Sequence, residues 1–240
     1  IPKASILQLK AETQMSDYLD RLFSGKAPQV LQTTGHDGNV FTQVQSGEEN
    51  AILSASGLLT YYNDGIHLTE DSPLISYDFA QSVAERFLKE RLQLSIFGLS
   101  LQSQWNLGVL SSSQTVQYCR SFNNRPVFDL SVEVTVVGDL VRQCTINPLR
   151  IVGEIGTVEW MTPASNILLR MLEDDYILAL RDQKLLQGEN WLVVKEIQFG
   201  YFSFFNSEQI AEAKPVWRVM FQDQQAVYYD AMTAKRLFHG

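Results

Sequence analysis

Three histidines and two cysteines are the side chains of this 240-residue chain that most readily do nucleophilic or metal chemistry. His36 and His67 each lie in a turn-rich stretch, and His239 is next to the last residue. None of them has a second His or Cys two to four residues away, which is the spacing typical of a zinc site. Cys119 and Cys144 also lack ligand spacing, and two cysteines are too few for a disulfide scaffold. We therefore expect no metal site and no cofactor.

Sequence motifs for catalysis are missing as well. The chain has no Gly-x-Ser-x-Gly elbow, no Cys-x-x-Cys, no P-loop and no dinucleotide fingerprint. The acid pairs Glu48-Glu49 and Asp174-Asp175 could do acid–base work, but adjacent residues of a helix point about 100° apart and do not converge on one substrate. We interpret both pairs as solvated structural residues. The sequence thus predicts that the chain is not an enzyme, and a hydrolase with an unfamiliar site around His67 stays open as an alternative.

One strand-like stretch, residues 199–205, is rich in aromatic side chains. Alternate residues of a strand point to opposite faces, so these aromatic residues lie on both faces. One interpretation is a strand that is covered on both sides, with a helix over one face. The other is an exposed aromatic patch that binds a partner protein. The candidate contact residues are Phe199, Tyr201, Phe202, Phe204 and Phe205.

The composition is that of a folded protein, with 45% hydrophobic and 19% charged residues. Its length suits one large domain or two small ones. The net charge is −8, and the basic residues are scattered singly, which argues against nucleic acid and against an anionic membrane surface as partners. No apolar run approaches the ~18 residues of a membrane span. Because the chain opens at Ile1 and not at a methionine, we expect an upstream signal or anchor.

The first third of the chain predicts a short helix, several strands and a longer helix. Apolar residues at helical spacing indicate a helix over residues 11–23, and short strands follow at 29–32, 40–44 and 51–62, the last broken into two near Gly57. Ser76 fits a helix N-cap, and the apolar stripe behind it indicates a helix over about residues 77–92.

Antiparallel strands are predicted next, from residue 114 to residue 146. Residues 127–137 alternate between apolar and polar side chains, which is typical of a sheet with one wet face. The dipeptides Asn123-Asn124 and Gly138-Asp139 on either side are signals for two-residue hairpin turns.

These two turns set a register for the cysteines. Cys119 would lie opposite Phe128 on the apolar face, and Cys144 opposite Glu133 on the polar face. Thiols on opposite faces of a sheet cannot reach disulfide geometry, so we predict that neither cysteine forms a disulfide.

A second helix followed by strands is predicted in the last third. Thr162 fits an N-cap with Pro163 at the first helical position, and the helix stripe comprises Ile167, Leu168, Met171 and Leu172. Strands are expected at residues 191–205, 216–221 and 226–229, with a turn at 223–224. Trp217 shares a strand face with Val219 and Phe221, which predicts a core position for it.

The order of helix and antiparallel strands therefore occurs twice. The sequence predicts an α+β fold with two helix-plus-antiparallel-sheet units in tandem, after an N-terminal helix and short strands. The predicted units are residues 1–152 and 153–240.

Four stretches of the second unit carry a resemblance to a known family. They are Met161–Ala164 opening a helix, Val194–Phe202 with its Gly-Tyr pair, the Pro-x-Trp-Arg-Val strand in Lys214–Val219, and the Tyr-Tyr-Asp-Ala ending of Tyr228–Ala231. Their order and spacing resemble the YycI/YycH family, and the chain length suits YycI better than YycH. The resemblance is specific over residues 161–235, while the helix after Ser76 fits more loosely.

The resemblance implies the extracytoplasmic part of a single-pass membrane protein of Gram-positive bacteria. Members of that family associate with the sensor histidine kinase of cell-wall homeostasis (WalK, also called YycG) and with the sister protein YycH, and they adjust kinase activity. We therefore expect a non-catalytic regulator of a two-component system that acts by protein–protein interaction at the cell membrane. An extracytoplasmic module that binds a small ligand or peptide is the alternative.

Overall fold

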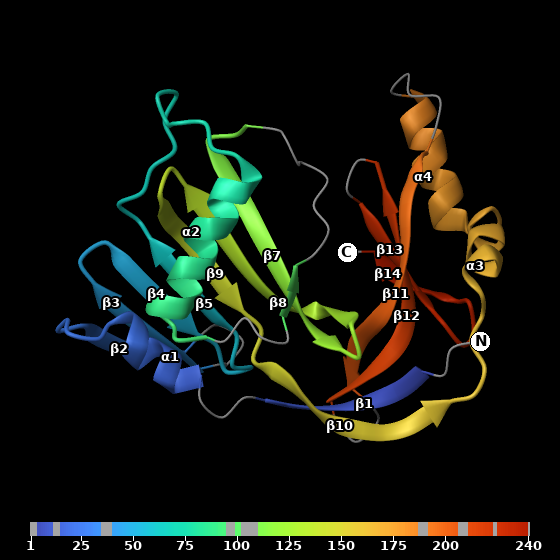
Figure 1. The fold of residues 1–240 in the computed structure, drawn as a ribbon, viewed down its shortest axis with the longest axis horizontal. Helices are drawn as coiled ribbons and strands as arrows, with labels where there is room; N and C mark the ends of the chain where they lie inside the picture. The colour runs from blue at the N-terminus through green and yellow to red at the C-terminus, as the bar shows by residue number, and fades with distance from the viewer. Residues whose placement is uncertain are drawn as a thin grey trace. The chain divides into compact units, whose positions relative to one another are not determined.

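The structure is a computed structural model that describes residues 4–11, 15–34, 40–94, 99–101, 110–186, 192–205, 211–222 and 225–239 (Figure 1). Of the described residues, 52% lie in strands and 21% in four short helices. The predicted α+β class with two helix-plus-antiparallel-sheet units in tandem is therefore wrong, because the fold is dominated by a mixed sheet. The prediction also missed the strands at residues 4–11 and 149–158.

The chain divides into two compact units that are not in tandem. Unit 1 comprises residues 1–9, 125–128 and 151–240, and unit 2 comprises residues 10–124 and 129–150. The predicted boundary lies after residue 152, whereas this division falls after residue 150 and also assigns two earlier segments to unit 1. Those segments belong there because Leu7 pairs with Ala213 and Val127 pairs, in parallel, with Tyr201.

Unit 2 is a sheet with strand order β6-β7-β8-β9-β5-β4-β3-β2. Its elements are α1 (Met15–Leu22), β2 (Gln29–Thr34), β3 (Val40–Ser46), β4 (Glu49–Leu53), β5 (Leu59–Asn63), α2 (Tyr77–Glu90), β6 (Leu99–Leu101), β7 (Ser113–Phe122), β8 (Arg125–Val137) and β9 (Leu140–Ile146). The N-terminal helix is shorter than predicted, since it begins at Met15 and residues 4–11 form a strand.

The hairpin turns of unit 2 confirm the turn signals. Asn123 and Asn124 both have positive φ, of 49° and 61°, as a type I′ turn requires. Gly138, at φ 59°, closes the next turn, and Val137 pairs with Leu140 across it. The predicted break near Gly57 also occurs, between β4 and β5.

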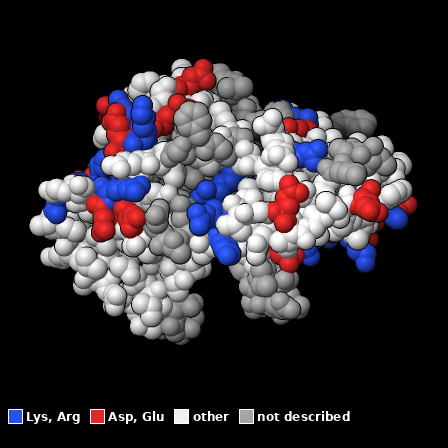
Figure 2. All heavy atoms as spheres, turned by 60° about the horizontal axis from the view of Figure 1, so that its bottom comes forward, with Lys and Arg blue, Asp and Glu red and all other residues white. Residues whose placement is uncertain are grey.

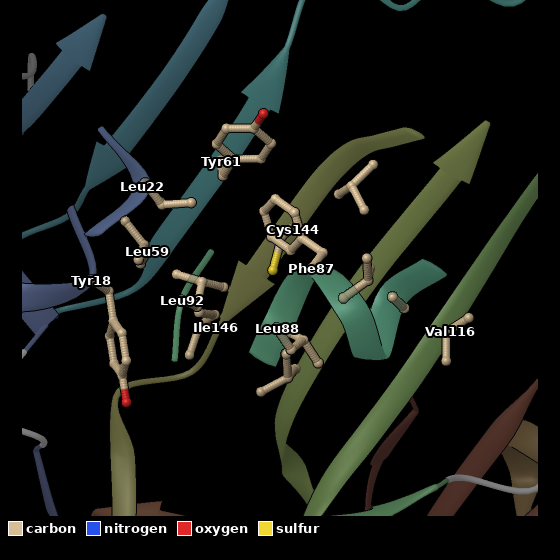
Figure 3. Close-up of a cluster of buried hydrophobic side chains, with 14 of the residues drawn as sticks. Tyr18, Leu22, Leu59, Tyr61, Phe87, Leu88, Leu92, Val116, Cys144 and Ile146 are labelled. Atoms are coloured by element: carbon tan, nitrogen blue, oxygen red, sulfur yellow. The ribbon is translucent and has the colours of Figure 1, made fainter. Parts of the chain in front are cut away.

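Helix α2 closes the core of unit 2, as its sequence predicts. The Ser76 hydroxyl accepts a hydrogen bond from the Phe79 amide at 3.2 Å, and six residues on one face of the helix are buried. Figure 3 shows Phe87, Leu88 and Leu92 facing side chains that come from the sheet and from α1, among them Leu59 and Ile146. The stripe works here because the sheet supplies apolar partners along its whole length.

Unit 1 has strand order β10-β1-β12-β11, with the start of β8 beside β11, and β13 and β14 follow from β12. Its elements are β1 (Ala4–Ala11), β10 (Leu149–Val158), α3 (Ala164–Met171), α4 (Asp175–Leu186), β11 (Val194–Phe205), β12 (Ala211–Phe221), β13 (Ala226–Asp230) and β14 (Arg236–His239). The division assigns the last two residues of β1 and the first two of β10 to unit 2. The predicted strand start at Trp191 and the turns at residues 35–39 and 223–224 lie outside the described residues.

The predicted start of the second helix is wrong by one residue. Pro163 occupies the N-cap position without a capping side chain, and the Thr162 hydroxyl instead donates to the carbonyl of Met232 at 3.3 Å. Helix α4 has no counterpart in the prediction, because its apolar residues run around the helix and do not form one stripe.

Candidate binding site

An apolar groove of about 700 Å³ lies in unit 1 along α3, α4 and the adjoining ends of two strands. It is lined by Ser165, Leu168, Leu169, Met171, Leu172, Ile177, Leu178, Arg181, Leu192, Val194 and Phe221. Ser165 and Arg181 are the polar members of this lining. The groove therefore offers a surface that binds by apolar contact and holds neither an acid–base pair nor a set of metal ligands.

The helices form this groove because only part of their apolar surface is used inside the unit. Ile167 and Met171 of α3 and Ile177 and Leu180 of α4 pack into a cluster with Val219, Phe221, Val227 and Tyr229 of the sheet. The neighbouring leucines point elsewhere: Leu169 is 62% exposed and Leu172 is 71% exposed. Half of the predicted stripe, Ile167 and Met171, is thus core, and the other half lines the groove.

An ion-paired carboxylate holds the turn between α3 and α4 in place. Arg236 Nε contacts both carboxylate oxygens of Asp174, at 3.1 and 2.9 Å, and the Tyr229 hydroxyl donates to the same carboxylate at 3.1 Å. Burial, followed by the nearby Asp174 charge, raises the pKa of Tyr229, so it remains a neutral donor. The expected solvated role for Asp174 is wrong, since its side chain is 12% exposed.

A second acid also turns out to be paired. Glu49 in unit 2 has ion pairs with Lys26 and, at 3.1 Å, with Arg91, and its side chain is 16% exposed. Burial by itself would raise the pKa of Glu49, but the hydrogen bonds from Lys26 and Arg91 outweigh it and the pKa is lowered. Burial and the neighbouring Glu49 charge raise the pKa of Tyr61 to about 12. The predicted solvated role is therefore wrong for Glu49 and Asp174, which are ion-paired and partly buried, whereas Glu48 and Asp175 are exposed.

The aromatic residues of β11 lie largely inside unit 1. Tyr201 is buried, and Phe199, Phe202 and Phe204 are partly buried, while the side chain of Phe205 lies outside the described residues. Phe199 packs edge-on against Trp217, with ring centroids 5.2 Å apart, and Phe202 packs against Tyr228 at 4.9 Å. A partner contact by Phe199, Tyr201, Phe202, Phe204 and Phe205 stays a prediction.

A buried cation, Arg218 of β12, pairs across the sheet with Gln198 of β11, and no sequence pattern predicted its burial. Arg218 is 2% exposed, donates to Gln198 Oε1 at 2.7 Å and lies over the Phe128 ring at 4.6 Å. That ring packs over Gly200, where a Cβ atom would come within 2.5 Å of the Pro126 carbonyl oxygen. Gly200 is therefore needed for the close approach of β8.

Trp217 has the predicted face but is not fully buried. It packs against the cluster that contains Val219 and Phe221, and its indole N–H donates to the Thr162 carbonyl at 2.9 Å. Trp217 therefore packs at the edge of the cluster, and its hydrogen bond holds the residue that precedes the N-cap of α3.

The described residues do not place a catalytic partner beside His67, as the hydrolase alternative requires. His67 is exposed and has no carboxylate hydrogen-bonded to it within the described ranges, whereas His36 and the side chain of His239 lie outside them. Across the part of the chain that the structure describes, no cluster of three or more His, Cys, Asp or Glu residues is arranged to hold a metal ion. No described helix has the length and apolar character that crossing a membrane requires.

Charge does not single out another site on the displayed face. In Figure 2, basic and acidic side chains lie next to one another in several places, and wide areas carry no charge. This distribution matches the low charged fraction of 19%.

A comparison with solved structures finds proteins whose fold is similar to that of this chain. The structure of an uncharacterized protein from Eubacterium rectale matches with a TM-score of 0.63 and 12% identity, over 98% of this chain and 86% of that one. The C-terminal domain of YpeB from Bacillus megaterium is a distant match, with a TM-score of 0.47 and 10% identity, over 97% of this chain and 98% of that one. The first likeness shows a shared fold.

Sequence comparisons add no family. No family model matches the chain, and no curated protein matches it. The resemblance to the YycI/YycH family is therefore carried by the motifs of residues 161–235 alone.

Proposed function

We propose that this chain is a non-catalytic regulatory module that acts by binding another protein, and that the groove along α3 and α4 is where it binds. The observation that carries this proposal is the groove itself, which has a volume of about 700 Å³, an apolar lining, and two lining leucines, Leu169 and Leu172, that are more than half exposed. Leaving such leucines in water is unfavourable by roughly 25 cal/mol per Å² of apolar area, so covering them provides the binding energy.

The extent of the apolar surface favours a protein over a small ligand. Leu185 and Leu186, near the end of α4, are 49% and 90% exposed, and Val193 is 44% exposed beside the strand that lines the groove. A ligand that filled the groove alone would leave these side chains in water. A helix with one apolar face covers an elongated groove of this kind.

The charge at the groove suggests what flanks that apolar face. Arg181 lines the groove and is 53% exposed in an ion pair with Asp182, so its guanidinium can turn toward an incoming acid at little cost. We therefore expect the partner segment to be an amphipathic helix with an acidic residue beside its apolar face.

The family resemblance supplies the proposed biological partner. It implies an extracytoplasmic domain of a membrane-anchored protein that adjusts a sensor histidine kinase together with YycH. A non-catalytic regulator shifts the kinase only if it binds one kinase state more tightly than the other. Anchoring in the same membrane would raise the effective concentration and allow a weak groove contact to suffice.

The proposal is tested in the native host by following a kinase-dependent promoter. The anchored chain, the unanchored chain, and anchored variants Leu169→Glu/Leu172→Glu and Val152→Glu replace the native copy. Leu169 and Leu172 line the groove, whereas Val152 is a 40% exposed residue of β10 outside it. We expect regulation by the anchored chain and by Val152→Glu, and its loss in the groove variant and in the unanchored form.

Each other outcome removes one part of the proposal. A groove variant that regulates normally while folding like the parent would exclude the groove as the binding site. Full regulation by the unanchored chain would refute the anchoring argument. If deleting the protein leaves the promoter unchanged, the kinase is not its target.

A small apolar ligand is the second candidate, because the groove volume falls within the roughly 300–1,000 Å³ of known ligand sites. Native mass spectrometry of the chain purified from its host tests this candidate. A bound small molecule that Leu169→Glu/Leu172→Glu removes would favour it, and an unliganded mass would count against it.

A further inference from the structure

Among the described residues, the last strand of the unit 2 sheet has a strand partner on one side only. Strand β2 pairs with β3 and with no other strand of the described residues. All six of its residues are exposed, among them Val30 at 60% and Leu31 at 50%. An open edge presents unpaired N–H and C=O groups to any extended chain that approaches it.

The usual features that protect such an edge are missing from β2. Neither β2 nor β3 contains a charged residue or a proline, and their pairing runs from Gln29–Gln45 to Thr34–Val40 without a bulge. The other sheet edges differ, since β10 carries Arg150 and Glu154, β14 carries Arg236, and β6 is three residues long. Only β2 among these described edges combines length, regular register and neutral side chains.

We infer that β2 is a self-association site, at which β2 of a second copy of this chain adds antiparallel to form a continuous sheet across two molecules. Identical strands related by a twofold axis pair antiparallel, and the same patch serves both partners. Pairing centred on Leu31 places the two Leu31 side chains opposite each other and Val30 opposite Gln32. No pair in this register brings like charges together, which would be destabilising in a charged strand.

The charge of unit 2 decides how this contact responds to salt. Over residues 10–124 and 129–150 the sequence has nine basic and fifteen acidic residues, a net charge of −6. Two copies therefore repel each other at long range, and added salt screens that repulsion. Self-association should strengthen with ionic strength, whereas binding of a basic foreign strand to the same edge would weaken.

The contact is expected to be weak in solution. Adding one six-residue strand buries less than the roughly 1,200 Å² of a stable interface, so the dimer forms at high protein concentration. Confinement in a membrane would raise the local concentration and favour the same pairing.

Sedimentation velocity of residues 1–240 over a range of concentrations and salt tests the inference. We expect the mass to rise from 27.2 kDa toward that of two copies as concentration increases, and to rise further at higher salt. Leu31→Lys should weaken the dimer about tenfold or more, since it places like charges opposite each other. Val152→Lys on the β10 edge and Leu172→Glu in the groove serve as matched controls and should leave the dimer unchanged.

Hydrogen exchange supplies a second readout that does not depend on variants. Amides of β2 should become more protected at high protein concentration, while those of β10 should not. A chain that stays monomeric at all concentrations and salts overturns the inference. A dimer that Leu172→Glu or Val152→Lys abolishes and Leu31→Lys leaves intact overturns it too, because association then uses another surface.

Discussion

Helices pack on sheets in both units. In unit 2, helix α2 buries most of its apolar residues in the core, whereas in unit 1, helices α3 and α4 leave many of theirs exposed. Helix α2 buries six of its fourteen residues, including Ala80, Ala84 and Leu88 with no exposed surface. Helix α3 buries two of eight residues, and α4 buries two of twelve. Unit 2 therefore covers the apolar residues of α2 except Phe79, which is 46% exposed, whereas unit 1 leaves several apolar residues of α3 and α4 exposed.

This difference shows where binding capacity arises in a chain without reactive residues. An apolar stripe stabilises a fold where the sheet beneath it covers the stripe, as happens for six residues of α2. The leucines of α3 and α4 that point away from the sheet contribute little to folding, yet they remain large and apolar. Surface of this kind is typical of a contact with another molecule.

Truncating one leucine in each region would sharpen the comparison and gives the largest expected effect. Leu88→Ala should destabilise the protein by about 2–5 kcal/mol, because Leu88 has no exposed surface and its removal leaves a cavity. Leu172→Ala should change stability by at most about 0.5 kcal/mol, because the side chain is 71% exposed. Urea unfolding followed by circular dichroism measures both.

The two results are informative only together. A Leu172→Ala variant that loses as much stability as Leu88→Ala would show that the groove leucines are part of the core. In that case the surplus of apolar surface on α3 and α4 would not exist.

The pH dependence of stability provides a second, smaller test. It concerns the ion pairs of Glu49 with Lys26 and with Arg91, which follows α2. The folded state lowers the pKa of Glu49 below its ordinary value of 4.5, so the ionised carboxylate stabilises the fold above that pH. This contribution is lost as the pH falls through the lowered pKa and Glu49 takes up a proton. Wild type should therefore be more stable than Glu49→Gln at neutral pH, and their stabilities should converge below about pH 4.5.

Unfolding free energies of wild type and Glu49→Gln at several pH values test this prediction. Asn50→Ala, a neighbouring uncharged change, serves as the control and should keep the parent's pH profile. A difference between wild type and Glu49→Gln that stays constant down to acid pH would contradict the prediction.

Local signals in the sequence predicted the turns and α2, because a cap, a stripe or an Asn-Asn pair acts on its own neighbours. The prediction missed β1 and β10, because their partners lie far away in the chain and the alternation in β1, from Leu7 to Lys10, is short. The groove could not be predicted from the sequence either. Two of its lining leucines, Leu168 and Leu172, form one apparent stripe with Ile167 and Met171, and only the packed structure separates the buried residues from the exposed ones.

The strand pairing at the cysteines differs from the prediction because β9 contains one extra residue. Val136 pairs with Val141 but Thr135 pairs with Gln143, so a bulge at Arg142 shifts β9 by one residue. Cys144 consequently lies opposite Val134 on the apolar face, and its predicted place opposite Glu133 is wrong. The argument from opposite faces no longer holds.

A better argument still predicts that both thiols stay reduced. Cys119 is in β7 and Cys144 is in β9, with β8 between them in the sheet. Adjacent strands lie about 4.8 Å apart, so Cα atoms two strands away are separated by more than the ~7 Å limit of a disulfide. Both side chains are buried, and burial raises the pKa of Cys144, which keeps its reactive thiolate scarce.

We expect two titratable thiols in denaturant without reductant, one each in Cys119→Ser and Cys144→Ser, and slow reaction of all forms while folded. A purified, air-exposed sample with no titratable thiol in denaturant would show that the two strands can approach closely, and the strand order of unit 2 would then be wrong.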